Sequence, residues 1–139
     1  MAIFGIGIDL IEVSRIRQAI EKYGFRFTTR IFTPDEIAFC EKLKDKYPSY
    51  AGRFAAKEAF SKALGTGIRG TISWLEIEIC DNERTRPTIL LNGRARALVG
   101  NRAVHLSLTH LKDYAAAVVV ITEDPMPAGG SPISCNSNF

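Results

Sequence analysis

The sequence contains little cysteine and no long hydrophobic run. Its three cysteines, Cys40, Cys80 and Cys135, lie far apart and form no Cys-x-x-Cys pair, so neither a zinc site nor a dithiol redox site is expected. No stretch of about 18 apolar residues could cross a bilayer, and the N-terminus lacks the basic and apolar regions of a secretory signal. These absences favour a cytoplasmic protein with reduced thiols.

Neither sign of charge is in large excess. The 18 basic residues exceed the 15 acidic ones by a net charge of +3, which does not require a nucleic-acid partner. The basic residues are unevenly distributed, however. Between Ser14 and Arg30 a single acid, Glu21, stands among the basic residues Arg15, Arg17, Lys22, Arg26 and Arg30. We call this segment the basic patch; it could be a solvated surface or could bind an acidic partner.

The 139 residues and a hydrophobic content of 46% indicate one small globular domain. We predict this domain over residues 1–122 and a disordered tail, rich in Pro, Gly, Ser and Asn, over 123–139. Hydrophobic periodicity predicts strands over 3–13, 74–79, 87–91, 104–108 and 115–121 and helices over 14–23, 34–46, 49–64 and 94–99. The predicted fold class is α+β, with helices followed by an antiparallel sheet.

Several residues predict where the helices begin and end. Ser14 is the expected N-cap of the first helix, and Thr33 with Glu36 forms a capping box around Pro34 at the next helix. Glycines are expected just beyond the helix ends, at Gly24, Gly65 and Gly100.

The nearly continuous apolar run over 3–13 predicts a buried strand, and Asp9 is an exception within it. A buried carboxylate must be paired, hydrogen-bonded or bound to a metal, because burying it alone costs several kcal/mol. Alternatively, Asp9 caps the following helix. Gly5 and Gly7 precede it and would let another group approach the backbone closely.

The helix over 53–64 carries Glu58 and Lys62, which are four positions apart and share a face. They could form a solvated ion pair worth about 0.2–0.5 kcal/mol. Small alanines on the same helix, and the glycine-rich loop over 65–70, favour a functional interpretation instead. Because this loop follows a helix, it is not a dinucleotide fingerprint; it is a connector or a loop whose N–H groups face a phosphate.

If Asp9 and Glu58 face each other, they form an oxygen-only site that suits Mg²⁺. Lys62 would then reach a neighbouring phosphate, and Arg53 and His105 could bind a further one. The residues alone do not show that these groups converge.

The stretch Gly5-Ile6-Gly7-Ile8-Asp9 and the run over 51–67 together resemble the two signatures of the holo-[acyl-carrier-protein] synthase family of 4′-phosphopantetheinyl transferases. The resemblance covers residues 3–121. It implies a 4′-phosphopantetheinyl transferase-like fold that assembles as a homotrimer with coenzyme A between subunits. It also implies transfer of the 4′-phosphopantetheine arm from coenzyme A to a serine of apo-acyl carrier protein, which supports fatty acid biosynthesis.

The same resemblance implies roles for individual residues. Asp9, Glu58 and Lys62 would be catalytic, with Asp9 and Glu58 holding Mg²⁺ and Lys62 neutralising the pyrophosphate. Coenzyme A would be bound by Arg53, Lys62, Gly65 and, from a neighbouring chain, His105.

Docking of the acidic carrier protein would use the basic patch, through Arg15 and Lys22. No nucleic acid or membrane is expected as a partner.

Three alternatives stay open. The general base could be Glu58, through a water, or Asp35, which could instead be a helix N-terminal acid. His105 and His110 could be hairpin histidines with satisfied hydrogen bonds, and a family role for His110 is not assigned. The whole chain could also be a non-enzymatic basic module that docks on RNA or an acidic protein, for which the pair of Asp9 and Glu58 would not be needed.

Overall fold

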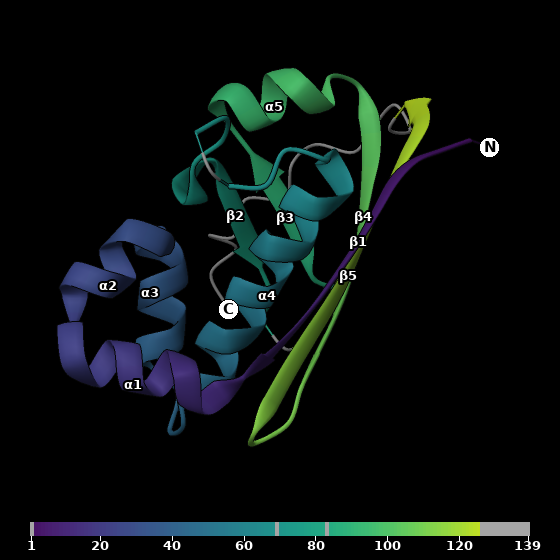
Figure 1. Cartoon of the computed structure of the whole chain (residues 1–139). Helices are drawn as coiled ribbons and strands as arrows, with labels where there is room; N and C mark the ends of the chain where they lie inside the picture. The colour runs from purple at the N-terminus through teal and green to yellow at the C-terminus, as the bar shows by residue number, and fades with distance from the viewer. Residues whose placement is uncertain (1, 69, 83, 126–139) are drawn as a thin grey trace.

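The computed structural model describes residues 2–68, 70–82 and 84–125, which form an α+β fold with two antiparallel sheets (Figure 1). The larger sheet has the strand order β1–β5–β4, and the smaller one pairs β2 with β3. The strand bounds are β1 Ile3–Glu12, β2 Ile77–Cys80, β3 Thr88–Leu91, β4 Arg102–His110 and β5 Tyr114–Pro125.

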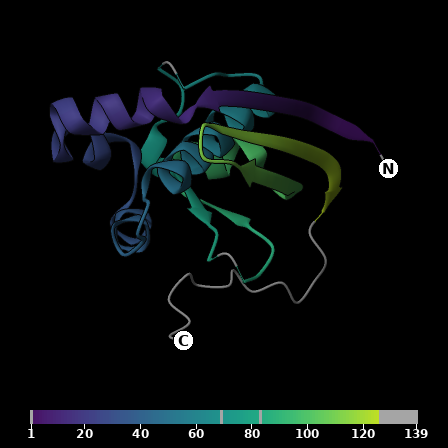
Figure 2. The ribbon, with the colours of Figure 1, turned by 90° about the horizontal axis from the view of Figure 1, so that it is seen from below.

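The helices surround one central helix, α4. Their bounds are α1 Val13–Tyr23, α2 Phe25–Ile31, α3 Pro34–Glu41, α4 Tyr47–Leu64 and α5 Gly93–Val99. Figures 1 and 2 show α1, α2 and α3 gathered at one end of the molecule, with the larger sheet along one side of α4. Within the described residues, no helix is both long and apolar enough to cross a membrane.

Helix α4 is buried on almost all sides. Its alanines Ala55, Ala56, Ala59 and Ala63 are at most 4% exposed and pack with Phe60 into the main core. This core is completed by the inward residues of β5, including Val119 and Ile121, and by Ile77 and Ile79 of β2. A second core lies between α1, α2 and the first half of α4, around Tyr50 and Phe32. Helix α4 therefore contributes residues to both cores, on more than one of its faces.

Strand β1 lies unusually close to α4. A Cβ atom added at Gly7 would lie 1.9 Å from the carbonyl oxygen of Ala59, and one added at Gly5 would lie 1.9 Å from that of Ala63. Only glycine fits at either position. The predicted close approach at these glycines is confirmed, and the approaching group is the backbone of α4.

The face of the larger sheet that points away from α4 is apolar and exposed. Ile6, Ile8 and Leu10 on β1 are 58%, 66% and 69% exposed. The interpretation of β1 as a buried strand is therefore wrong, because α4 covers only one face of this edge strand. The predicted order of helices followed by a sheet also needs correction, since β1 precedes the helices and pairs with β5.

The predicted start of α3 is confirmed. Glu36 N–H donates to Thr33 Oγ1 at 3.3 Å, and Thr33 N–H donates to Glu36 Oε1 at 2.9 Å, with Pro34 as the first helical residue. The glycines predicted at helix ends occupy C-cap positions, at Gly24, Gly65 and Gly100. The predicted antiparallel arrangement is confirmed for the pairs β2–β3 and β4–β5.

Several predicted boundaries were wrong. Helix α1 begins at Val13 with Glu12 as N-cap, so Ser14 is not the cap. Helix α3 ends at Glu41 and not near residue 46, and the strand predicted over 74–79 begins with a 3-10 helix, Trp74–Glu76. Helix α2 was not predicted, because its seven residues are too few to show a helical period.

The thiols and the tail also differ from expectation. Cys40 is a buried free thiol whose pKa is raised by burial, whereas Cys80 is disulfide-bonded although reduced thiols were predicted. Strand β5 runs to Pro125, so residues 123–125 belong to the sheet and not to the tail. The rest of the predicted tail, 126–139, with Cys135, lies outside the described residues.

Replacing Gly7 by alanine should destabilise the protein by about 1–3 kcal/mol or more, because the new methyl group overlaps the Ala59 carbonyl. Urea unfolding measures the effect. The control is Gly52→Ala in α4, where a Cβ meets only side chains, Leu108 at 3.1 Å and His110 at 3.6 Å, and helix propensity favours alanine by about 0.5–1 kcal/mol. Equal stability of wild type and Gly7→Ala would show that β1 does not need this contact.

Candidate active site

Asp9 and Lys62 meet at the exposed edge of β1. Lys62 Nζ donates to Asp9 Oδ1 at 3.1 Å and to the Ile8 carbonyl oxygen at 3.0 Å. The Asp9 side chain is 17% exposed and the Lys62 side chain 52%. The predicted capping role for Asp9 is wrong, because Glu12 is the N-cap of α1. Asp9 is instead a half-buried carboxylate that already attracts a cation.

Glu58 joins this edge from α4. It lies one turn before Lys62, so both side chains point to the same side of the helix. Glu58 is half-buried, whereas its neighbours Lys57 and Ala59 are fully buried. The close packing of Gly5 and Gly7 on α4 brings Asp9 to this side of the helix. The three residues predicted to be catalytic are therefore carried by two elements in direct contact.

The donor set at this corner suits a hard divalent cation. Asp9 and Glu58 offer only carboxylate oxygens, and Mg²⁺ is often held by one or two carboxylates, with substrate phosphates and waters completing its shell. In the described residues, no cluster of three or more His, Cys, Asp or Glu side chains could hold a metal by itself. At a site of this kind, oxygen atoms from waters or from a substrate would complete the shell of the ion.

Gly65 ends α4 directly after Leu64, with a φ of 87° that favours glycine. The N–H groups of Gly65, Thr66 and Gly67 all donate to the Ser61 carbonyl oxygen, at 3.0, 3.2 and 3.3 Å. The suggestion that N–H groups of this loop face a phosphate is not supported at these three residues. Gly65 holds the end of the helix that carries Lys62.

Arg53 is not brought to this corner. It is 3% exposed, its Nη1 donates to Ser49 Oγ at 2.6 Å, and its Nη2 donates to the Asp81 carbonyl oxygen at 2.7 Å. Its guanidinium also stacks over the ring of Phe39, 4.7 Å from the centroid. These contacts connect α4 to α3 and to the end of β2, so Arg53 has a structural role in the single chain.

His105 lies on the other side of the sheet. Along β4, Val104, Leu106 and Leu108 pack against the core, so the alternate residues, including His105, point away from α4. His105 Nε2 lies 3.4 Å from Thr122 Oγ1 on this outer face. One chain therefore does not bring His105 to Asp9. His110, at the end of β4, lies next to Gly52 of α4.

The remaining predicted residues lie on the helical end of the molecule. Arg15 and Lys22 are exposed on α1, and Lys22 Nζ lies 5.2 Å from the ring centroid of Tyr23. Asp35 is exposed in the first turn of α3, as expected of an acid that complements a helix N-terminus.

The buried pair of Glu36 and Lys57 was missed by the sequence reasoning. Lys57 Nζ and Glu36 Oε1 are 2.6 Å apart, and the two side chains are 0% and 1% exposed. Burial lowers the pKa of Lys57, and the Glu36 carboxylate opposes that shift. The capping box predicted Glu36 as a helix-start residue, but nothing in the pattern linked it to a lysine 21 positions away.

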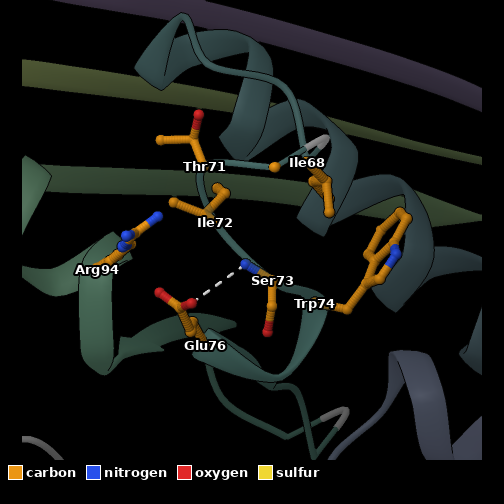
Figure 3. A pocket seen from close by; sticks show the side chains of 8 residues that line it. Ile68, Thr71, Ile72, Ser73, Trp74, Glu76 and Arg94 are labelled. Atoms are coloured by element: carbon orange, nitrogen blue, oxygen red, sulfur yellow. Dashed lines mark hydrogen bonds between the residues drawn. The ribbon is translucent and has the colours of Figure 1, made fainter.

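A separate pocket lies beyond the loop that follows α4. Figure 3 shows it between Ile68, Thr71, Ile72 and Trp74 on one side and Glu76 and Arg94 on the other. Glu76 accepts the N–H of Ser73 at 3.2 Å and the N–H of Ala95 at 2.7 Å, so it joins the loop to α5. None of the predicted site residues lines this pocket.

Comparison with known proteins places this geometry in a family. The family model for the 4′-phosphopantetheinyl transferase superfamily matches residues 5–119. The chain belongs to this superfamily. The predicted resemblance is thus confirmed, and so is the assignment of the chain as a phosphopantetheinyl transferase enzyme. The alternative of a non-enzymatic binding module is excluded.

The relatives are named holo-[acyl-carrier-protein] synthase. One from Koribacter versatilis is 43% identical over 87% of this chain and 99% of its own. One from Chloroherpeton thalassium is 46% identical over 86% of this chain and 98% of its own.

Solved structures of holo-[acyl-carrier-protein] synthases are similar to this chain in sequence and in fold. A holo-(acyl-carrier-protein) synthase from Bacillus anthracis in complex with coenzyme A (3′,5′-ADP) is 40% identical, covers 89% of this chain and all of its own, and gives a TM-score of 0.76. The enzyme from Helicobacter pylori in complex with coenzyme A is 36% identical over 84% of this chain and 99% of its own, with a TM-score of 0.74.

The buried contacts of Arg53 predict a mainly structural effect of its removal. Arg53→Met should lower the free energy of unfolding by about 1.5–3 kcal/mol, the usual value of a hydrogen bond to a charged group. Chemical denaturation measures this, with Arg94→Met on the exposed face of α5 as the control. A stability equal to that of the control variant would show that these contacts contribute nothing to folding.

Proposed function

We propose that the chain transfers the 4′-phosphopantetheine group from coenzyme A to a serine of apo-acyl carrier protein and releases adenosine 3′,5′-bisphosphate. The observation that carries the proposal is the meeting of Asp9 with Lys62 beside Glu58, at the contact of β1 with α4. This corner combines two carboxylates with an ammonium group, as transfer of a charged phosphoryl group requires. The solved relatives that hold coenzyme A support the choice of donor.

The proposed reaction is a substitution at phosphorus. The serine oxygen attacks the phosphorus that bears the pantetheine arm, and a new O–P bond forms. The bond from that phosphorus to the bridging oxygen breaks, and this oxygen leaves with adenosine 3′,5′-bisphosphate. The serine proton passes to a base, for which Glu58, directly or through a water, is our candidate because it is half-buried beside Lys62.

Lys62 has the freedom that its proposed role requires. Its side chain is half exposed, so the ammonium group can turn from Asp9 and Ile8 toward a phosphate while it stays in contact with solvent. There it would offset the negative charge of the diphosphate and of the leaving group. Arg53 is omitted from the residues that we propose to contact coenzyme A, because it is buried and its Nη1 and Nη2 already donate within the core.

Asp9 and Glu58 are the residues that would hold Mg²⁺. When bound, the ion would supply Lewis-acid stabilisation of charge on the phosphates. Asp9 fits this role because it is a half-buried carboxylate that attracts a cation in the single chain. Gly65 fixes the end of α4 next to the coenzyme's proposed position.

We propose that the acidic carrier protein docks on α1, through Arg15 and Lys22. Both are exposed, and the basic patch contains only one acid, so it would steer an acidic helix toward the site. The reaction would take place in the cytoplasm and support fatty acid biosynthesis, without a membrane or nucleic acid as partner.

A homotrimer is part of the proposal. His105 points to the outer face of the sheet, whereas Asp9 faces α4, so both can serve one coenzyme only if they come from neighbouring chains. The exposed apolar residues Ile6, Ile8 and Leu10 on the same outer face offer a surface for such an assembly.

Replacing Asp9 by asparagine or Glu58 by glutamine should each lower kcat by about 10²–10³-fold, because each removes a carboxylate that would hold Mg²⁺ against the diphosphate. Mass spectrometry of apo-carrier protein incubated with coenzyme A and Mg²⁺ measures the added arm. Asp124→Asn, on the exposed end of β5, is the matched control. Wild-type protein that adds no arm would refute the proposed function, and fully active variants would refute the site.

Mixing inactive His105→Ala with inactive Asp9→Ala should restore part of the activity, because mixed assemblies contain sites with both residues intact. The same transfer assay measures the recovery after subunit exchange, which is followed by mass spectrometry of the intact assembly. Absence of recovery in a sample that has exchanged subunits would place the whole site in one chain.

A further inference from the structure

The buried pair of Glu36 and Lys57 joins four segments of the chain. Besides contacting Glu36, Lys57 Nζ donates to the carbonyl oxygen of Ile31 at 2.6 Å and to that of Trp74 at 3.2 Å. Its three N–H bonds therefore each have an acceptor, at the end of α2, in α3 and before β2.

The carboxylate of Glu36 is equally engaged. Its Oε1 accepts from Lys57 and from the Thr33 N–H at 2.9 Å, and its Oε2 accepts the N–H of Ile79 in β2 at 3.1 Å. Neither member of the pair can turn away without leaving a buried polar group unpaired.

The pair holds α4 on the side opposite to β1. At 3.6 residues per turn, Ala59 and Ala63 lie about 200° and 240° around the helix from Lys57. Those alanines contact Gly7 and Gly5 of β1. Glu58 and Lys62 lie between the two sides, at about 100° and 140°. A rotation of α4 about its axis would therefore move Glu58 and Lys62 relative to Asp9.

We propose that Glu36 and Lys57 are positioning residues of the transferase. They fix the rotation of α4 so that Glu58 and Lys62 face Asp9, and they touch neither substrate nor metal themselves. The proposal rests on the proposed function, which assigns the transfer reaction to Asp9, Glu58 and Lys62. It adds a determinant of the reaction in α3, an element that carries none of the residues that we propose to contact the substrates.

If Glu36 and Lys57 had a purely structural role, their replacement would have a different result. Buried ion pairs can often be replaced by neutral or apolar groups of similar shape without loss of stability. A replacement of this kind separates the positioning role from the structural role. If the pair positions α4, its removal changes the orientation of α4 against β1 and lowers kcat by more than a loss of stability would. The double variant Glu36→Gln/Lys57→Met removes both charges and keeps side chains of similar length.

The double variant should have a lower Tm than the wild type, because Lys57→Met leaves the carbonyl oxygens of Ile31 and Trp74 without their donor. Its kcat should be about ten- to a hundredfold lower, since small misplacements at a reacting centre have effects of that size. The KM for the carrier protein should change less than about twofold, because α1 is not displaced. The control is Val99→Ala in α5, a buried residue of the main core that makes no contact with Glu36 or Lys57 in the hydrogen bonds described above; it should lower stability without changing kcat.

A measurement without turnover separates this proposal from the proposed function. In the double variant, the backbone amide NMR signals of Ile8, Asp9 and Lys62 should shift, because α4 is no longer held in one orientation against β1. A wild-type protein without transferase activity would refute the proposed function, and the amide signals would still test the positioning of Lys62 against Asp9.

The proposal is overturned if the double variant keeps a kcat within about twofold of wild type and its amide shifts stay confined to α2, α3 and β2. If the double variant does not fold, Glu36→Gln alone is measured in the same two ways. That variant keeps an oxygen acceptor for Lys57 and removes only the charge, so a smaller loss of kcat with shifted Asp9 and Lys62 amides supports the proposal, and unchanged values overturn it.

Discussion

The close approach of β1 to α4 is the constraint on which the rest of the structure depends. Gly7 and Gly5 lie against the carbonyl groups of Ala59 and Ala63, at a separation that no larger residue permits. The strand carries Asp9 and the helix carries Glu58 and Lys62, so this packing also sets the distances within the candidate active site. Core packing and chemistry therefore depend on the same small residues.

Helix α4 has polar contacts on its opposite side that are unusual for a core helix. Arg53 and Lys57 are buried there, and both bind backbone carbonyl groups of other segments. Arginine and lysine are seldom fully buried without partners. Here Asp81 accepts from Arg53, and Ile31, Glu36 and Trp74 accept from Lys57. The helix thus resists both displacement along the strand and rotation about its axis.

Much of this arrangement could be predicted from local patterns. The capping box at Thr33 and Glu36 and the glycine after Leu64 follow from residue chemistry at fixed spacing, and the signatures around Asp9 and Glu58 identified the family. What could not be predicted depends on contacts between distant segments. No pattern shows that Lys57 pairs with Glu36, that Arg53 is buried, or that β1 is covered on one face only.

The edge position of β1 has a consequence for folding fidelity. Successive residues of a strand point to opposite faces, so a slip of one residue in its pairing with β5 would exchange the two faces. Ile6 or Ile8 would then take the place of Gly7 against α4, where only glycine fits, and Asp9 would face solvent. Steric overlap therefore disfavours misaligned pairing, and a molecule with a complete core also has Asp9 on the same side of α4 as Glu58.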